Sequence, residues 1–231
     1  MGLLNLWSTK EQSQAQEATI GPVEPQIDRA APTRPTWYSP SVLLPTTVLT
    51  SGLLLANFLY RRNLRRISSV LQIPPAFLNN KRTLFGRVTS VGDADNFRFF
   101  HTPGGRLSGW DIWRSVPTER KDISKSGTLH IRLAGVDAPE AAHFGNPAQP
   151  YAKEALEWLT SYVGGRRVRV QLWSRDRYER VVCSVKIWKW NGRRDVSLEM
   201  VKAGWATVYL QAGAQYGGIE HELKTAEVIA K

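Results

Sequence analysis

The sequence predicts an α+β fold in which a five-stranded β-barrel carries three helices and one transmembrane helix precedes it. Three observations support this prediction: an uncharged stretch of twenty residues, a later series of five short β-type segments, and helical periodicity between and after those segments. The 231 residues suffice for one domain of ordinary size with extensions.

Residues 1–36 are predicted to form a disordered arm. They are rich in Gln, Glu, Ala and Pro, and Pro22, Pro25, Pro32 and Pro35 interrupt any helical period. Such a composition buries too little apolar surface to offset the entropy lost on ordering. We therefore expect no core in this region.

Residues 41–60, SVLLPTTVLTSGLLLANFLY, carry no charge and are predicted to form a transmembrane helix. A helix rises about 1.5 Å per residue, so twenty residues span a hydrocarbon core of about 30 Å. Trp37, Tyr38 and Tyr60 flank the segment, as aromatic anchors do at a membrane interface. The alternative is a buried helix of a soluble protein, which the Thr and Ser residues and Asn57 favour.

The basic sequence RRNLRR follows the apolar segment directly, and residues 61–80 are predicted to be a basic juxtamembrane linker. Four arginines on this side outnumber Arg29 and Arg34 on the other, so the positive-inside rule places the C-terminal part in the cytosol or a matrix-like compartment. Binding of these arginines to anionic lipid is a further possibility that could coexist with any function of the C-terminal domain.

Residues 81–231 are predicted to form the folded domain. Segments with β-type composition, several with period-two alternation, occupy 83–91, 96–101, 128–136, 167–174 and 180–190. Helices are expected at 151–163, about 196–203 and about 218–230. A five-stranded barrel with an interposed helix is the OB-type arrangement. Residues 101–127 show turn residues without a clear period, so we expect an insertion loop there.

Composition indicates the kind of partner. There are 31 Lys and Arg residues against 20 Asp and Glu, giving a formal charge of +11 and a pI of about 10. This excess favours a polyanion such as nucleic acid or anionic lipid, and charge alone does not separate the two. Cys183 is the only cysteine, so no intrachain disulfide can form and a reducing compartment is favoured.

The segment Arg132-Leu-Ala-Gly-Val-Asp137-Ala138-Pro-Glu140 carries the clearest chemistry. Asp137 and Asp95, from the earlier turn GDADN, follow two predicted strands and could together offer oxygen ligands to a hard cation such as Ca²⁺. Glu140 could take a proton from an attacking water. Arg132 could bind a phosphate through its planar fork, with Arg180 in DRYER as a second candidate.

Each of these elements has an alternative interpretation. The pair Asp137 and Glu140 also fits a helix capping box, for which Pro139 suits the first turn. Asp93 and Asp95 are common turn formers. Arg180 at the start of a strand is, taken singly, an ordinary solvated side chain.

In their order and spacing, the acidic turn, R-L-x-x-x-D-x-P-E and D-x-Y-x-R resemble the motifs of the staphylococcal nuclease (thermonuclease) family, from about Thr83 to Ala230. The resemblance implies a staphylococcal-nuclease-like OB barrel with three helices. It also implies Asp95, Asp137 and the Ala138 carbonyl as Ca²⁺ ligands, Arg132 and Arg180 as phosphate-binding catalytic residues, and Glu140 as general base. Ala138 replaces a frequent threonine, and Glu179 stands where glycine is common.

The apolar segment, the 101–127 insertion and the Trp-rich last strand together resemble a fungal subgroup, the long-chronological-lifespan-type endonucleases. This resemblance alone implies a mitochondrial, single-pass membrane location. The sequence thus predicts a membrane-anchored, Ca²⁺-dependent nuclease acting on DNA and/or RNA without a small-molecule cofactor. The alternative is a catalytically silent OB-type module that binds nucleic acid or a protein.

Overall fold

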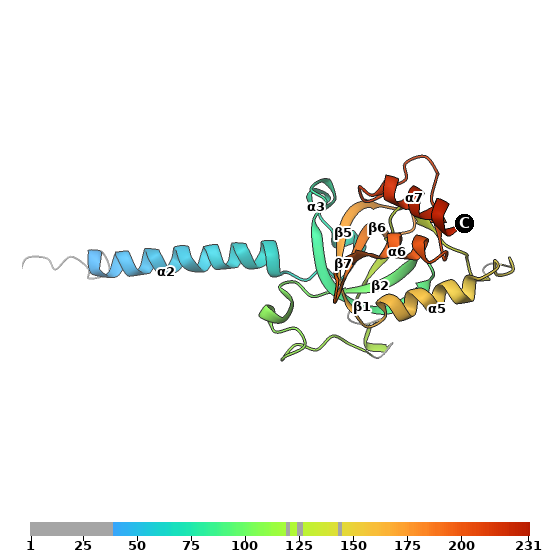
Figure 1. Ribbon diagram of the computed structural model, residues 1–231. Coiled ribbons are helices and arrows are strands. Elements are labelled where there is room, and N and C mark those ends of the chain that lie inside the picture. Colours follow the sequence, from blue (N-terminus) through green and yellow to red (C-terminus); the bar gives the residue numbers. More distant parts are fainter. Residues whose placement is uncertain (1–38, 119–120, 124–126, 143–144) are drawn as a thin grey trace, which may run out of the picture. The chain divides into compact units, whose positions relative to one another are not determined.

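The computed structural model describes residues 39–118, 121–123, 127–142 and 145–231 (Figure 1). The chain divides into two units, Met1–Leu53 and Leu54–Lys231, which are considered separately. The predicted disordered arm, residues 1–36, lies outside the described residues.

The apolar segment forms helix α2, Pro40–Leu59, which continues as a π-helical turn, Tyr60–Leu64. None of its residues is buried by the described part of the chain. The Thr46 hydroxyl donates to the Val42 carbonyl (2.6 Å), and the Thr50 hydroxyl to the Thr46 carbonyl (2.8 Å). These hydroxyls find partners inside the helix, as an apolar surrounding requires. By length and composition Pro40–Leu64 could cross a membrane.

Five strands form the predicted barrel: β1 (Thr83–Asp93), β2 (Asn96–His101), β3 (Leu129–Leu133), β5 (Arg167–Arg175) and β6 (Val181–Lys189). They are hydrogen-bonded in the order β3-β2-β1-β5-β6, and a parallel pairing between β3 and β6 closes the ring. Alternation decides what faces inward, as in β6, where Val181, Cys183, Val185 and Ile187 are all buried. The α+β barrel prediction is confirmed.

Three further strands were not predicted as separate elements: β4 (Val136–Asp137), which pairs with β8 (Thr207–Val208), and β7 (Gly192–Asp195), which pairs with β6. They have two to four residues, too few to show a period in the sequence. The predicted third strand, 128–136, is therefore wrong as one element, since the chain turns between Leu133 and Val136. Gly135 enables the turn with φ of 75°, and a Cβ there would lie 2.8 Å from the Leu223 side chain.

The three predicted helices are present as α5 (Ala152–Val163), α6 (Val196–Lys202) and α7 (Glu220–Ala230). Each buries one apolar side, and α5 buries Ala155, Leu159 and Val163 in the main core cluster. A short additional helix, α3 (Pro75–Asn79), precedes β1.

The segment predicted as a linker, 61–80, contributes to the core. Ile67, Val70 and Ile73 are buried in the main hydrophobic cluster. Arg175 donates from Nη2 to the carbonyls of Val70 (2.9 Å) and Ile73 (3.1 Å). These three residues recur every third position over only seven residues, directly before Pro74 and Pro75, and so short a run did not indicate a buried element. We propose that the folded domain begins near residue 66 rather than at 81.

The described part of the insertion loop 101–127 is attached to the barrel. It contains a 3₁₀ turn, Gly105–Ser108, and its Trp110 and Val116 form a small cluster with Phe100 apart from the main core. Asp111 accepts a hydrogen bond from Arg167 and forms an ion pair with Arg87 (3.7 Å). The loop is thus tied to the outside of β1 and β5.

Candidate active site

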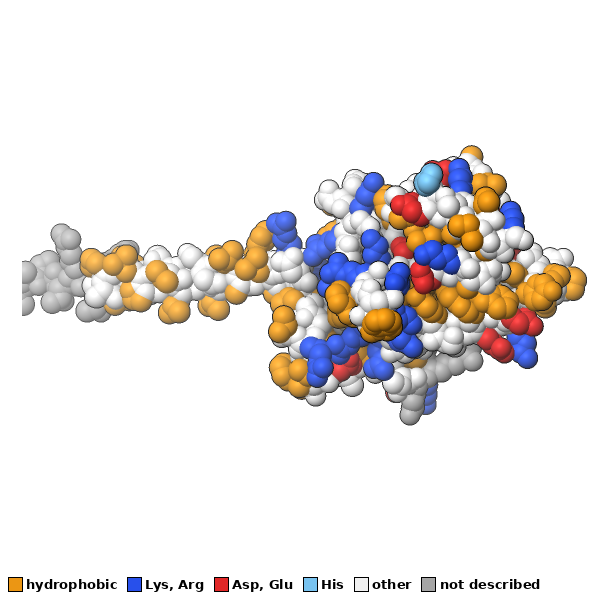
Figure 2. Space-filling view, in the orientation of Figure 1, with side chains coloured by type: hydrophobic (Ala, Val, Ile, Leu, Met, Phe, Trp, Pro, Cys, Tyr) orange, Lys and Arg blue, Asp and Glu red, His pale blue; other side chains and the backbone are white. Residues whose placement is uncertain are grey.

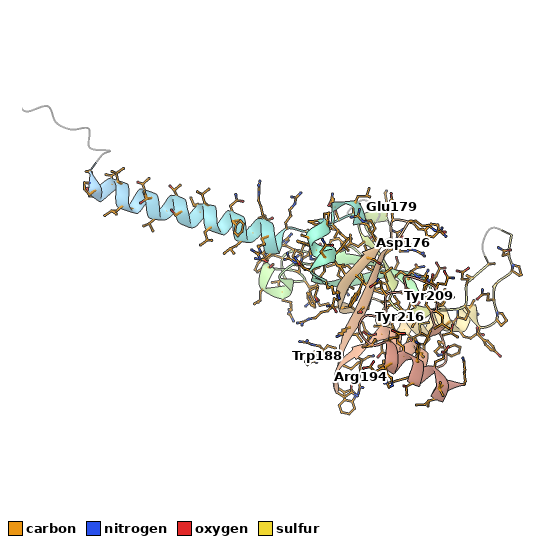
Figure 3. All side chains as sticks on the ribbon, turned by 90° about the horizontal axis from the view of Figure 1, so that it is seen from above. Asp176, Glu179, Trp188, Arg194, Tyr209 and Tyr216 are labelled. Carbon is orange, nitrogen blue, oxygen red and sulfur yellow. The ribbon has the colours of Figure 1, made fainter. Side chains whose placement is uncertain are left out.

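A groove of about 430 Å³ opens where β3 and the turn between β5 and β6 meet the segment after β8. Arg132, Asp176 and Arg180 line it, together with Tyr178 and Tyr209. Figure 3 shows Asp176 and Glu179 at one end of the β5–β6 hairpin and Trp188 at the other. Two of the predicted catalytic residues, Arg132 and Arg180, therefore lie in one groove, although they are distant in sequence.

Arg132 lies between the two predicted metal-ligating carboxylates. Its Nη1 is 3.1 Å from Asp95 Oδ2, and its Nη2 donates to Asp137 Oδ1 over 3.3 Å. The strands explain this meeting, because the β2–β3 register places Arg132 beside Asn96 and the Leu133 amide donates to the Asp95 carbonyl (2.9 Å). Asp137 arrives from β4 after the turn at Gly135.

Asn96 holds the acidic turn in place and was missed in the sequence. It is buried, and its Nδ2 donates to Asp93 Oδ2 (2.8 Å) and Asp95 Oδ1 (3.1 Å). Its Oδ1 lies 3.0 Å from His130 Nε2. Because the Asn96 amide nitrogen serves the carboxylates, its oxygen accepts and His130 must donate from Nε2.

His130 is neutral at physiological pH. Burial, followed by the charges of Arg98 and Arg180, lowers the pKa of His130 to about 4. His130 stands two residues before Arg132 on β3, so strand alternation was the signal that places both on one side.

Asp176 orients Arg180. The Arg180 amide donates to Asp176 Oδ1 (2.9 Å), and Arg180 Nε donates to Asp176 Oδ2 (2.6 Å). Burial tends to raise the pKa of Asp176, but the hydrogen bonds from Arg180 and Tyr178 outweigh it and lower the pKa overall. An ionised Asp176 thus fixes one edge of the guanidinium and leaves its terminal nitrogens for a ligand.

Glu179 adopts φ of 56°, in the left-handed region that favours glycine. The backbone therefore accounts for the glycine that is common at this place in the motif. Among the described residues Glu179 forms no ion pair with Arg180, and its side chain is exposed.

Tyr209 lines the groove and Tyr216 contacts it from outside the lining; neither was predicted. The Arg132 guanidinium carbon lies 5.5 Å from the centre of the Tyr209 ring, and the Tyr216 hydroxyl donates to the Tyr209 carbonyl (2.8 Å). Figure 3 shows the two tyrosines beside each other. A ring beside Arg132 restricts the directions its guanidinium can take.

Glu140 is exposed, and the structure does not bring it into contact with the arginines. Its amide donates to Gln149 Oε1 (3.1 Å), and its carbonyl accepts from the Gln149 amide (2.9 Å). Its carboxylate has no hydrogen bond or ion pair within the described ranges. No helix begins after Asp137 in the described residues, since β4 ends there and α5 starts at Ala152. The capping-box alternative is therefore wrong.

The oxygen set around Asp95 suits a hard cation. Asp95 and Asp137 share Arg132 as a partner, and the buried Ala138 follows directly. No group of three or more His, Cys, Asp or Glu side chains gathers in the part of the chain that the structure describes. A Ca²⁺ ion here would use two carboxylates, the Ala138 carbonyl and water, which is compatible with calcium coordination. Burial raises the pKa of Asp95, and the charge of Arg132 partly offsets this rise. A bound cation would likewise lower the pKa of Asp95.

The comparisons with known proteins identify the family. Residues 130–231 match the family model described as staphylococcal nuclease homologue; this range contains Arg132, Asp137, Glu140 and Arg180, whereas Asp95 lies upstream. A protein of Pyricularia oryzae named probable endonuclease LCL3 is 54% identical over 196 residues, covering 84% of this chain and 76% of that protein.

Two more fungal proteins with the same name extend the comparison. The one from Candida albicans is 50% identical over 195 residues, covering 84% of this chain and 83% of the relative. The one from Pyrenophora tritici-repentis is 45% identical over 228 residues, covering 97% of this chain and 82% of the relative. The chain belongs to the staphylococcal nuclease homologue family.

Proposed function

We propose that this chain is an endonuclease that hydrolyses phosphodiester bonds of DNA and/or RNA, requires Ca²⁺ and is anchored in a membrane through residues 41–60. The observation that carries the proposal is the single groove in which Arg132 and Arg180 are each oriented by carboxylates. The family is one of nucleases, and the relatives named above carry the name of a probable endonuclease.

The arginines supply binding and charge stabilisation. Each guanidinium offers donors in a plane that matches two phosphate oxygens, and negative charge on those oxygens grows during attack by water. Asp95, Asp137 and Asp176 hold the guanidiniums in fixed directions, so little reorganisation is needed when a phosphate binds.

The proton transfer is assigned to Glu140. As water attacks phosphorus and the ester P–O bond breaks, Glu140 accepts the proton of the water and the leaving oxygen is protonated in turn. This role comes from the motif Asp137-Ala-Pro-Glu140. Asp95, Asp137 and the Ala138 carbonyl would hold Ca²⁺, which when bound contributes positive charge next to the phosphate oxygens.

The membrane anchor is supported by α2 and the turn after it, the one span in the described residues long and apolar enough to cross a membrane. Resistance of the full-length chain to alkaline extraction from membranes would test it. The mitochondrial location rests on the resemblance to the fungal subgroup, and cell fractionation would test it.

The function is tested by cleavage assays of the full-length protein in detergent, on single-stranded DNA, duplex DNA and RNA, with Ca²⁺ and with a chelator. We expect cutting with Ca²⁺ that stops with the chelator and resumes when Ca²⁺ is restored. A folded protein that cuts none of the three but binds them in a salt-sensitive way would instead identify the silent binding module.

A further inference from the structure

A second pocket, of about 370 Å³, lies directly after the apolar segment and within the unit Leu54–Lys231. Five arginines line it: Arg61, Arg62, Arg65, Arg66 and Arg82. No Asp or Glu of the described chain lies among its lining residues. In Figure 2, Lys and Arg side chains gather on the folded unit around α3 and β7. We call the pocket lined by these five arginines the arginine pocket.

The described contacts of Arg82, in the wall of the arginine pocket, are with oxygen atoms and an aromatic ring and not with a carboxylate. Arg82 Nη2 donates to the Arg62 carbonyl (2.8 Å) and to Asn63 Oδ1 (3.2 Å), while its guanidinium lies 4.1 Å from the centre of the Phe77 ring. Arg66 donates to the Gly127 carbonyl and lies 3.7 Å from the centre of the Phe100 ring. A carbonyl, an amide oxygen and a ring thus hold Arg82 in place without cancelling its positive charge.

His101, which also lines the pocket, is held in its neutral form. The Ile67 amide donates to His101 Nδ1 (3.0 Å), which requires an unprotonated nitrogen. Burial, then the charges of Arg66 and Arg82, lowers the pKa of His101 to about 4. A pocket in which guanidiniums converge without acids is a site for an anion, because an anion relieves their mutual repulsion.

Phosphate is the anion that this lining fits best. Arginine binds phosphate oxygens in pairs through its planar fork. The rest of the lining is largely apolar, with Ile67, Phe77, Leu84 and Phe85 beside the arginines. A charged head with apolar carbon beside it suits a phospholipid better than an inorganic ion.

Chain connectivity selects the source of the phosphate. Arg61 follows Tyr60, the last residue of the apolar segment, so an inserted segment holds Arg61–Arg66 at the headgroup level. The candidate active-site groove shares no lining residue with the arginine pocket. We propose that the arginine pocket binds the phosphate headgroup of an anionic phospholipid in the membrane that holds residues 41–60. This rests on the proposed membrane anchor, and it assigns a lipid class and a binding pocket to the folded domain.

The test uses the full-length chain in neutral detergent, titrated with phosphatidylglycerol or phosphatidylcholine while bound lipid is counted by native mass spectrometry. The variant Arg61→Gln/Arg65→Gln removes two charges whose side chains hold no described hydrogen bond, so the pocket walls remain. The matched control is Arg169→Gln/Arg193→Gln, two exposed arginines on β5 and β7 outside the pocket. Thermal unfolding of each protein confirms that it is folded.

We expect selective binding of phosphatidylglycerol, weakened about 30-fold in the pocket variant because each basic residue near a membrane surface contributes about fivefold, and unchanged in the control. Equal binding of phosphatidylcholine, or an unchanged affinity in the pocket variant, would overturn the proposal. So would displacement of the lipid by millimolar inorganic phosphate, which indicates a free-anion site, or by single-stranded DNA, which indicates a nucleic-acid site.

Membrane extraction and DNA cleavage are measured on the same three proteins. If the wild-type protein is extracted from the membrane, the proposed anchor is refuted. If it does not cleave DNA, the proposed nuclease activity is refuted. An inserted protein without selectivity for phosphatidylglycerol would refute the arginine pocket alone.

Discussion

The candidate active-site groove and the arginine pocket use the same residue type in opposite ways. In the groove, Arg132 contacts Asp95 and Asp137, and Arg180 contacts Asp176. In the arginine pocket, Arg82 contacts a carbonyl, an amide oxygen and a ring, and no described acid lines the cavity.

The difference shows two uses of an arginine: one in which the direction of its guanidinium is fixed, and one in which its charge attracts an anion. A carboxylate fixes the direction of a guanidinium but cancels much of its charge, which suits a site where geometry determines the rate. Carbonyls and rings position an arginine and leave its full charge to the ligand, which suits retention of an anion. The groove should therefore be sensitive to small changes of shape, whereas the pocket should be sensitive to the number of charges.

The largest effect is expected from Glu140→Gln. Loss of the proton acceptor should reduce turnover by about 10²- to 10⁴-fold, with little change in the affinity for single-stranded DNA. Single-turnover cleavage and fluorescence anisotropy measure the two quantities. Glu154→Gln, an exposed residue on α5, is the control and should retain full turnover. Retention of wild-type turnover by the Glu140 variant would exclude Glu140 as the base.

Replacing Arg132 or Arg180 by lysine tests whether shape outweighs charge in the groove. Lysine retains the charge but lacks the planar fork, so cleavage should fall by about 10²- to 10³-fold. The same exchange at Arg169, which is exposed outside the groove, should have no such effect. Near-normal cleavage by both groove variants would show that charge alone is sufficient there and would remove the contrast with the pocket.

The burial of His101, together with the charges of Arg66 and Arg82 beside it, should appear in the pH dependence of folding. His101 has a pKa of about 4 in the folded chain, below its ordinary 6.5, so the unfolded chain binds the proton first. The contribution of His101 to the free energy of unfolding is therefore complete above about pH 6.5. It decreases as pH falls toward 4, by on the order of 2–3 kcal/mol.

Urea unfolding of the full-length chain, followed by tryptophan fluorescence between pH 7 and 4.5, measures this dependence. His101→Asn keeps an acceptor for the Ile67 amide and should flatten the curve, although His130, with a pKa also lowered to about 4, leaves some slope. His221→Asn on α7 is the control. Identical slopes for the His101 variant and the wild type would contradict the prediction.

A smaller effect is expected from Asp176→Asn. The amide can still accept a hydrogen bond from Arg180 but lacks the charge, so Arg180 should be less firmly oriented and cleavage should fall about tenfold. Asp111→Asn is a matched control, because Asp111 also binds arginines, Arg87 and Arg167, outside the groove. Equal losses in both variants would indicate a general effect on folding instead of orientation of Arg180.

Much of the fold and part of the site were predictable from the sequence. The barrel strands alternate or are rich in β-branched and aromatic residues, and the helices show helical spacing, so local patterns revealed them. The motifs predicted that Asp95 and Asp137 converge and that Arg132 belongs to the same site, but not that Arg132 forms ion pairs with both carboxylates. The core residues Ile67, Val70 and Ile73 were not, because each is buried through contacts with distant strands, such as the bonds from Arg175.

The sequence also did not reveal the residues that hold the predicted site residues in position. Asn96 was assigned no role from the sequence, yet its side-chain amide joins the acidic turn to His130. Tyr209 comes from a segment about seventy residues after Asp137 in the printed sequence, and it reaches Arg132 only because β8 pairs with β4. Side-chain partners set by strand pairing carry no local signal.

The parallel pairing of β3 with β6 has a consequence for when activity can arise. It sets Arg132 beside Val182, and so brings the arginine of one motif next to the strand that begins after Arg180. Closure of such a distant pair is a late and slow event, since the entropy of the intervening loop must be lost first. A chain still emerging from the ribosome, or one with the barrel open, therefore does not have Arg132 and Arg180 together in one groove. Cleavage activity would then measure the fraction of chains that have completed folding.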